Sequence, residues 1–174
     1  MIQNSEIFLV DSNSFMTPYR FYYAFDLVPA YWNAIKQHMK TGRIVVLDMV
    51  KEEIEKGKDE LATWLSKVED ITVIPHVNAE TILRYQEVIQ YISTCGLYKA
   101  TALHNWAQSG IADPWLIASA IANGYTLVTE EVGSGGLSKK NPNKAAKIPD
   151  VANHFGTKTI NIYDMMRKLN IKIQ

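Results

Sequence analysis

The chain has 174 residues, of which 47% are hydrophobic and 21% are charged, as in an ordinary globular domain with its own core. Its 18 basic residues equal its 18 acidic residues, so net charge gives no indication of a nucleic-acid-binding protein. The single cysteine, Cys95, excludes an internal disulfide and a thiolate metal cluster, and a reduced, cytoplasmic location is expected. No apolar run reaches the roughly 18 residues of a membrane span, and Asp11 interrupts the first such run too early for a signal peptide.

The first predicted strand is the apolar run from Ile7 to Val10, which does not alternate with polar residues and is therefore expected to be buried. Asp11 follows it directly, and Ser12 and Asn13 come next. Open α/β sheets carry their sites at the carboxyl ends of such strands. Because Asp-Ser-Asn is also a common N-cap sequence, Asp11 alone has two interpretations, a site residue or a cap.

An aromatic segment follows the helix break expected at Pro18. Packing in the core or under a lid is the favoured interpretation of so many rings, and base stacking is the alternative. A helix is then expected from Pro29 to about Lys40, with Gly42 ending it. The aromatic residues of the segment are Tyr19, Phe21, Tyr22, Tyr23 and Phe25.

The second predicted strand spans residues 43–47 and leads into a helix for which Asp48 is the expected N-cap. This helix carries several acids. The helical period places Glu53 on the flank of the apolar stripe, nearer the core than Glu52 or Glu55. Glu53 is therefore either a site residue that faces the sheet edge or part of a solvated charged face.

The middle of the chain is expected to be mostly helical, up to a sharp helix start at Asp113-Pro114. An acid followed by proline is typical of the first helical turn, and Gly124 ends this apolar, buried helix. Asp113 is thus an expected N-cap whose second oxygen could bind a cation. The elements expected before it are helices at 61–68, 78–95 and 98–108 and a strand at 71–75.

A third buried strand, residues 125–129, runs into Glu130 and Glu131. The preceding helix and this strand form an α–β unit, which implies a parallel sheet. The loop that follows is expected to be flexible, and either grips a phosphate backbone or is simply solvated. Its basic residues are Lys139, Lys140, Lys144 and Lys147. A short helix, a last strand at 158–161 and a terminal helix at 163–169 complete the chain.

Acids thus follow three predicted parallel strands, at Asp11, Glu53 and Glu131, and Asp113 lies one connection upstream of the third strand. The carboxyl ends of parallel strands share one edge of a sheet. Carboxylates gathered there repel one another unless a cation is present. Oxygen ligands suit Mg²⁺ or Mn²⁺, whereas the scattered histidines show no spacing for zinc.

From about residue 6 to residue 163 the order and spacing of these motifs resemble the PIN domain, and the whole chain, residues 1–174, is expected to be one such domain. The matching pieces are the strand with Asp11-Ser12-Asn13, Val50-x-x-Glu53-Ile54, Ala112-Asp113-Pro114-Trp115-Leu116-Ile117-Ala118, Leu127-Val128-Thr129-Glu130-Glu131 and the late Lys-Ile-Pro-Asp-Val run at 147–151. The resemblance implies an α/β fold with three α/β/α layers around a mainly parallel sheet of about four to five strands.

The resemblance also implies a ribonuclease that uses one or two Mg²⁺ or Mn²⁺ ions, and often the toxin of a toxin–antitoxin pair. Its acids map onto Asp11, Glu53, Asp113 and Glu131, with Asp11, Asp113 and Glu131 as metal ligands. The family usually has Asp at the last position, where this chain has Glu131 with Glu130 beside it. The residues in supporting positions are Ser12, Asn13, Thr129 and Glu130.

The implied partners are RNA, an antitoxin protein and a second copy of the chain as a homodimer, with no membrane. The loop lysines Lys139, Lys140, Lys144 and Lys147 are the candidates for RNA contact. Two alternatives remain open. One is a PIN-like module that binds RNA or is regulated by a partner without catalysis. The other is a phosphoesterase that acts on DNA or on flap structures.

Overall fold

The computed structural model describes residues 5–173, which divide into two compact units. The first unit contains the chain up to Pro75, Thr126–Glu130 and the segment from Ile160 onward. The second contains His76–Tyr125 and Glu131–Thr159. Each unit is thus assembled from stretches that are separated in the chain. The expectation of a single nuclease domain over residues 1–174 stays a prediction.

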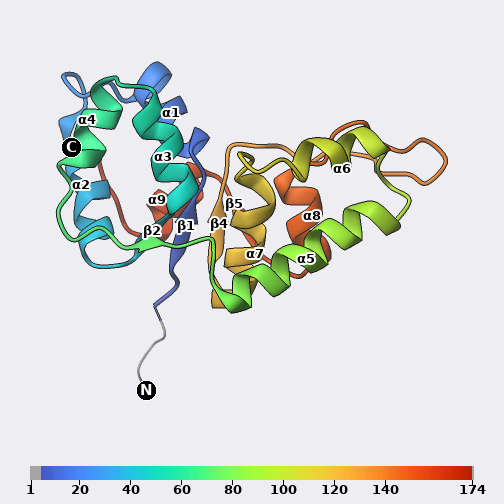
Figure 1. Ribbon diagram of the computed structural model, residues 1–174. Coiled ribbons are helices and arrows are strands. Elements are labelled where there is room, and N and C mark those ends of the chain that lie inside the picture. Colours follow the sequence, from blue (N-terminus) through green and yellow to red (C-terminus); the bar gives the residue numbers. More distant parts are fainter. Residues whose placement is uncertain (1–4, 174) are drawn as a thin grey trace. The chain divides into compact units, whose positions relative to one another are not determined.

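A five-stranded sheet, ordered β3-β2-β1-β4-β5, organises the first unit (Figure 1). The pairs β1–β2, β1–β4 and β2–β3 are all parallel. The middle strands are buried along their whole length, which explains why their sequences are apolar without alternation. The strands are β1 (Phe8–Val10), β2 (Ile44–Leu47), β3 (Val73–Ile74), β4 (Thr126–Val128) and β5 (Thr159–Ile160).

Short helices connect the strands of the first unit. The break expected at Pro18 is a change of helix type rather than a stop, because Pro18 has helical backbone angles and opens a π-helical turn, η1. Gly42, at φ +69°, follows the end of the next helix as expected. The helices are α1 (Asn13–Thr17), η1 (Pro18–Tyr22), α2 (Pro29–Lys40), α3 (Asp48–Lys56), α4 (Glu60–Ser66) and α9 (Ile162–Lys168).

The aromatic segment both packs and remains exposed. Tyr23 packs against the fully buried Tyr31, with ring centroids 4.4 Å apart, and Phe25 stacks on the buried Trp32 at the same distance. In contrast, the exposed fraction of Phe21 is 73%. The packing interpretation therefore holds for the second half of the segment, while η1 presents aromatic surface to solvent.

Four helices make up the second unit among the described residues, and α5 packs along α7 (Figure 1). The ring of Tyr85 on α5 stacks on Trp115 of α7 with centroids 3.9 Å apart. Asn78 caps α5 by accepting a hydrogen bond from the Thr81 backbone N–H at 3.0 Å. The helices are α5 (Ala79–Thr94), α6 (Ala100–Trp106), α7 (Asp113–Asn123) and α8 (Ile148–His154).

Two predicted N-caps are wrong by one residue. Asp48 and Asp113 are each the first residue of their helix, and Leu47 and Ala112 occupy the cap positions. Asp48 uses Oδ1 to accept the Met49 backbone N–H at 2.7 Å. Gly124 ends α7 in the left-handed conformation at φ 70°, as expected.

The expected α/β fold on a mainly parallel sheet of four to five strands is confirmed. Within residues 5–173, no helix is both long and apolar enough to cross a membrane.

Candidate active site

The register between β1 and β4 places Asp11 beside Thr129. Val10 pairs with Val128, and each strand ends there. The Asp11 backbone N–H donates to the Val128 carbonyl at 2.9 Å, which extends the parallel ladder by one step. The residues after the two strands therefore lie at the same edge of the sheet, where parallel sheets carry their sites.

Two hydroxyl groups hold the carboxylate of Asp11. Thr129 Oγ1 donates to Oδ2 at 3.1 Å, and Ser12 Oγ donates to Oδ1 at 3.4 Å. The exposed fractions of the three residues are 4% for Asp11, 3% for Ser12 and 4% for Thr129. A buried carboxylate is costly unless donors or a cation compensate it. Ser12 and Thr129 thus donate hydrogen bonds directly to the Asp11 carboxylate.

The other small polar residues at the start of α1 behave differently. Asn13, the first residue of α1, is exposed. Ser14, which the sequence does not single out, is fully buried and its hydroxyl donates to the Val128 carbonyl at 3.3 Å. Ser14 therefore ties α1 to the end of β4.

Glu53 lies on α3 and is exposed. The expectation that it lies nearer the core than Glu55 is wrong, because Glu55 is the less exposed of the two. Lys51 pairs with Glu55 one helical turn away, at 2.6 Å between Nζ and Oε1, and this holds the Glu55 side chain along the helix.

The second unit brings Glu131 together with Lys147. Lys147 Nζ donates to Oε1 of Glu131 at 2.8 Å, and the Ile148 backbone N–H donates to Oε2 at 2.9 Å. Ile148 is the first residue of α8, so Glu131 places its charge at a helix N-terminus, where negative charge is favourable.

Lys147 is the centre of a small group of acids in this unit. Its hydrogen bond to Glu131 and the charge of that residue, with further contributions from Asp113 and Asp150, raise its pKa above the ordinary value for lysine. Asp113 is half-buried at the start of α7. Asp150, which sequence reasoning did not choose, accepts the Ser134 backbone N–H at 2.9 Å. The Lys-Ile-Pro-Asp order, with an acid next to proline at the start of α8, is the sequence pattern that could have pointed to Asp150.

Glu130 has a different position from its neighbour Glu131. Its Oε1 accepts the backbone N–H of Ile162 at 2.9 Å, and Ile162 is the first residue of α9. Glu130 thus serves the first unit, where its charge also contributes to raising the pKa of Tyr31 after the larger effects of burial and of Tyr23.

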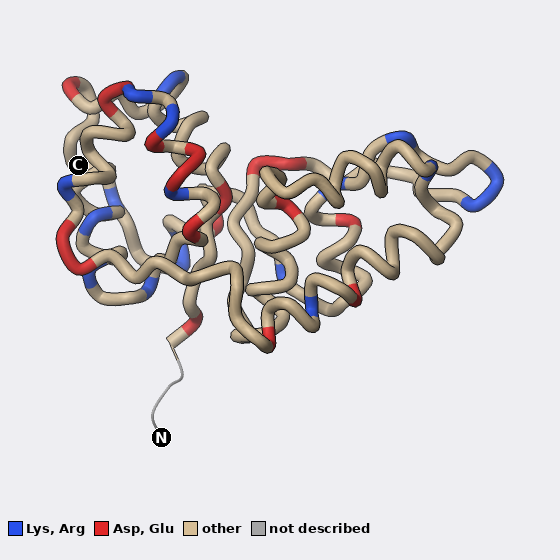
Figure 2. The backbone as a smooth tube through the Cα atoms, viewed as in Figure 1, with Lys and Arg blue, Asp and Glu red and all other residues tan. Residues whose placement is uncertain are grey.

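The basic loop separates into two parts. Lys139, Lys140 and Lys144 are exposed, on the stretch drawn with blue segments between β4 and α8 in Figure 2. The loop is fastened through its backbone, since Thr101 Oγ1 donates to the Lys144 carbonyl at 3.1 Å and the Lys99 N–H to the Asn143 carbonyl at 2.8 Å. Lys147 instead donates a hydrogen bond to Glu131.

Of the four predicted acids, Asp11 and Glu53 fall in the first unit and Asp113 and Glu131 in the second. Their convergence on one site therefore stays a prediction. Among residues 5–173, no group of three or more His, Cys, Asp or Glu side chains lies close enough to hold a metal ion. The polar side-chain atoms hydrogen-bonded to one another at Asp11 are all oxygens: its own carboxylate and the hydroxyls of Ser12 and Thr129. Oxygen atoms are the ligands that fit Mg²⁺ or Mn²⁺.

The family model for a domain of unknown function, DUF4411, matches residues 8–173. The chain belongs to the DUF4411 family. The comparison with curated proteins found no match. Among solved structures, this DUF4411 chain is similar to a chain in the crystal structure of VapBC2 from Rickettsia felis bound to a DNA fragment from its promoter. The TM-score is 0.56 at 17% sequence identity, over 89% of this chain and 98% of that one, so the likeness concerns the fold, which is PIN-like.

Proposed function

We propose that this DUF4411 protein is a metal-dependent endoribonuclease that hydrolyses RNA phosphodiester bonds. The observation that carries the proposal is the Asp11 carboxylate, buried at the end of the central strand and held by the hydroxyls of Ser12 and Thr129. A carboxylate fixed in this way is preorganised to bind a cation at the sheet edge. The PIN-like fold supports the same chemistry by analogy.

Each acid has a proposed role. Asp11, Asp113 and Glu131 would hold Mg²⁺ or Mn²⁺, which supplies positive charge that neutralises the phosphodiester. Glu53 would orient the attacking water, and its exposed position on α3 leaves its carboxylate accessible to solvent and substrate. Ser12 and Thr129 fix the orientation of the Asp11 carboxylate.

The exposed loop lysines would contact the RNA backbone. Lys139, Lys140 and Lys144 are exposed, whereas Lys147 is hydrogen-bonded to Glu131. Contacts from such residues position a nucleic acid without reading its sequence, and they weaken as salt increases.

We further propose that the protein is the toxin of a toxin–antitoxin pair. The similarity to a chain of VapBC2, whose crystal structure contains a DNA fragment from the promoter, supports this as an analogy of fold. A small DNA-binding protein that copurifies with the chain and suppresses its RNA cleavage is the expected partner.

A second candidate is a PIN-like module that binds RNA without cleaving it. It is favoured by Glu131, whose two oxygens accept from Lys147 and from the N-terminus of α8, as a purely structural side chain would. Such a module would bind RNA equally well with Glu131→Gln and with Glu53→Gln.

Cleavage assays with the purified chain separate these functions. The substrates are single-stranded RNA, single-stranded DNA and a DNA flap, each with Mg²⁺, with Mn²⁺ and with EDTA. We expect cleavage of RNA that requires the metal and that falls by more than about 100-fold in Asp11→Asn, since losing even a supporting residue of a metal site costs about 10- to 100-fold. Unchanged metal-dependent RNA cleavage by a folded Asp11→Asn variant would refute the assignment.

A further inference from the structure

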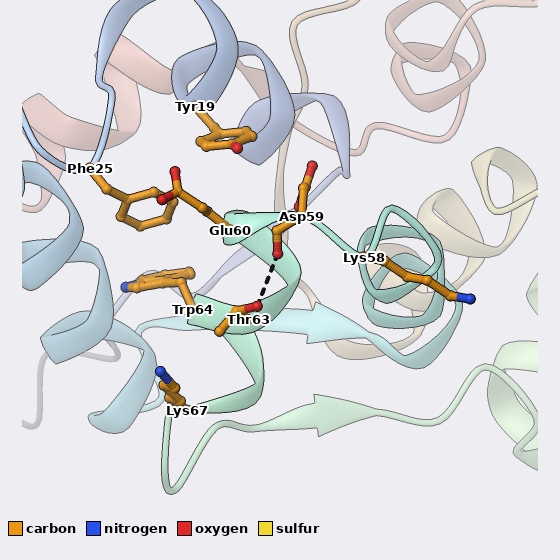
Figure 3. A pocket seen from close by; sticks show the side chains of 8 residues that line it. All are labelled: Tyr19, Phe25, Lys58, Asp59, Glu60, Thr63, Trp64 and Lys67. Atoms are coloured by element: carbon orange, nitrogen blue, oxygen red, sulfur yellow. Dashed lines mark hydrogen bonds between the residues drawn. The ribbon is translucent and has the colours of Figure 1, made fainter.

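A hollow in the first unit lies between the aromatic segment and the start of α4, apart from the sheet edge that carries Asp11. Its volume is about 730 Å³, within the usual range for small-ligand sites. Figure 3 shows it from close by. The residues that line it are Tyr19, Phe25, Lys58, Asp59, Glu60, Thr63, Trp64 and Lys67.

The aromatic walls of the hollow are supported from behind. Phe25 and Trp64 are only half-buried, with ring centroids 5.9 Å apart. Both pack against the buried ring of Trp32, at 4.4 Å and 4.9 Å respectively. Tyr19 continues this wall, 5.5 Å from Phe25. The rings are therefore fixed in place while part of each remains open to a planar ligand.

The charged residues that line the hollow differ in their contacts and in their exposure. Asp59 is the N-cap of α4, since its Oδ1 accepts a hydrogen bond from the Ala62 backbone N–H at 3.0 Å. Glu60, on the first turn of α4, and Lys67, at its end, are exposed. The Lys58 side chain points away from the rings in Figure 3. A carboxylate and an ammonium group thus remain at the rim beside the rings.

We propose that this hollow binds one base of single-stranded RNA, with a preference for guanine, and that Lys67 contacts the attached phosphate. An aromatic wall stacks on any base. The Glu60 carboxylate offers only acceptors, and guanine presents two adjacent N–H donors on its Watson–Crick edge, where adenine and uracil present one donor each. That the ligand is RNA rests on the proposed function. That the hollow recognises a guanine base and its phosphate is argued from the hollow alone.

Binding of mononucleotides to the full chain carrying Asp11→Asn tests the hollow without cleavage. Titration calorimetry with GMP, AMP, CMP and UMP, and with guanosine, is expected to give GMP as the tightest ligand. Trp64→Ala is expected to weaken GMP binding by about 5- to 150-fold, which is the range for removal of a stacking ring. Equal affinity for all four mononucleotides overturns the proposal. No binding of any of them or of a short single-stranded RNA overturns it as well, and a peptide would then be the ligand to test.

Two further variants keep the test valid if Trp64→Ala unfolds the packed rings. Glu60→Gln is expected to remove the preference for GMP over AMP, and Lys67→Gln to weaken GMP but not guanosine. Lys172→Gln and Glu69→Gln, exposed residues outside the hollow, are the matched controls. GMP binding that is unchanged in both rim variants overturns the proposal.

The result is separable from that of the cleavage assay. RNA cleavage by the wild type together with unchanged nucleotide binding by folded Trp64→Ala would overturn the hollow alone. Guanine-specific binding that depends on Trp64, with no cleavage of RNA under any metal condition, would overturn the nuclease and support the hollow.

Discussion

Thr129 Oγ1 donates a hydrogen bond to Oδ2 of Asp11 at 3.1 Å, although the two residues are 118 positions apart in the chain. The contact exists because β1 and β4 are parallel neighbours in a register that ends both strands at the same level. Both residues are buried, so the hydroxyl stabilises the carboxylate in surroundings where water contributes little. Asp11 is thus oriented by the sheet itself.

Replacing Thr129 with valine tests this relationship. The substitution keeps the shape of the side chain and removes the donor, so we expect the free energy of unfolding to fall by about 1–3 kcal/mol. Metal-dependent RNA cleavage should fall by about 10- to 100-fold, as for other supporting residues of metal sites. Urea denaturation and a cleavage time course measure the two effects.

Thr126→Val is the matched control. Thr126 lies on the same strand, and its Oγ1 donates to Oε1 of Glu6 at 2.8 Å rather than to Asp11. We expect this variant to lose stability and to keep its cleavage rate. If the two valine variants lose cleavage equally, the hydroxyl of Thr129 has no special role at Asp11.

The sequence predicted local features well and spatial contacts less well. The apolar run before Asp11 identified β1, because burial on both faces of a central strand leaves a pattern within four residues. The Thr129 contact depends on the register between strands that are distant in the chain, so only the family resemblance pointed to a supporting role for Thr129. Helical periodicity misplaced Glu53 relative to Glu55, because the ion pair with Lys51 holds the Glu55 side chain along the helix. The capping roles of Glu130 and Glu131 required knowing where α9 and α8 begin.

Glutamine substitutions at Glu130 and Glu131 separate structural and catalytic roles. Each carboxylate accepts from the first backbone N–H of a helix, α9 for Glu130 and α8 for Glu131. Glutamine keeps an acceptor and removes the charge, so each variant should lose about 0.3–1 kcal/mol of stability. We expect only Glu131→Gln to lower RNA cleavage as well. A cleavage defect in Glu130→Gln with normal Glu131→Gln would reassign the fourth acid.

The ion pair between Lys147 and Glu131 should make a small contribution to stability that depends on pH. Because Glu131, Asp113 and Asp150 raise the pKa of Lys147, the folded state holds its proton more tightly than the unfolded state. The contribution is therefore fully present below the ordinary lysine pKa of about 10.4 and is lost as pH rises through the higher folded-state value. Since 41% of the Lys147 side chain is exposed, its size should be only about 0.2–1 kcal/mol.

Urea denaturation of the wild type and Lys147→Met at pH about 8 and about 11.5 measures this contribution on either side of the titration. We expect the difference in unfolding free energy to be larger at the lower pH. Lys144→Met, which removes an exposed lysine of the same loop, provides the baseline. A difference that grows as pH rises would contradict the assigned direction of the pKa shift.

Gly133 lies so close to the carboxylate of Asp150 that a Cβ atom there would collide with it. A Cβ atom at Gly133 would lie 2.6 Å from Oδ1 of Asp150, while Oδ2 of the same carboxylate accepts the Ser134 backbone N–H at 2.9 Å. The carboxylate cannot move away from a new methyl group without weakening that hydrogen bond. Gly133→Ala should therefore destabilise the chain by about 1 kcal/mol, at the low end for overpacking because Asp150 is only half-buried.

A double-mutant cycle decides whether this contact is responsible. In the Asp150→Ala background, Gly133→Ala should cost much less, because the atom it collides with is gone. Gly136→Ala in the same loop is the control, since a Cβ there meets no atom within 4 Å. Thermal unfolding of the four cycle members gives the coupling free energy. A coupling near zero would mean that the cost of Gly133→Ala does not come from the Asp150 carboxylate.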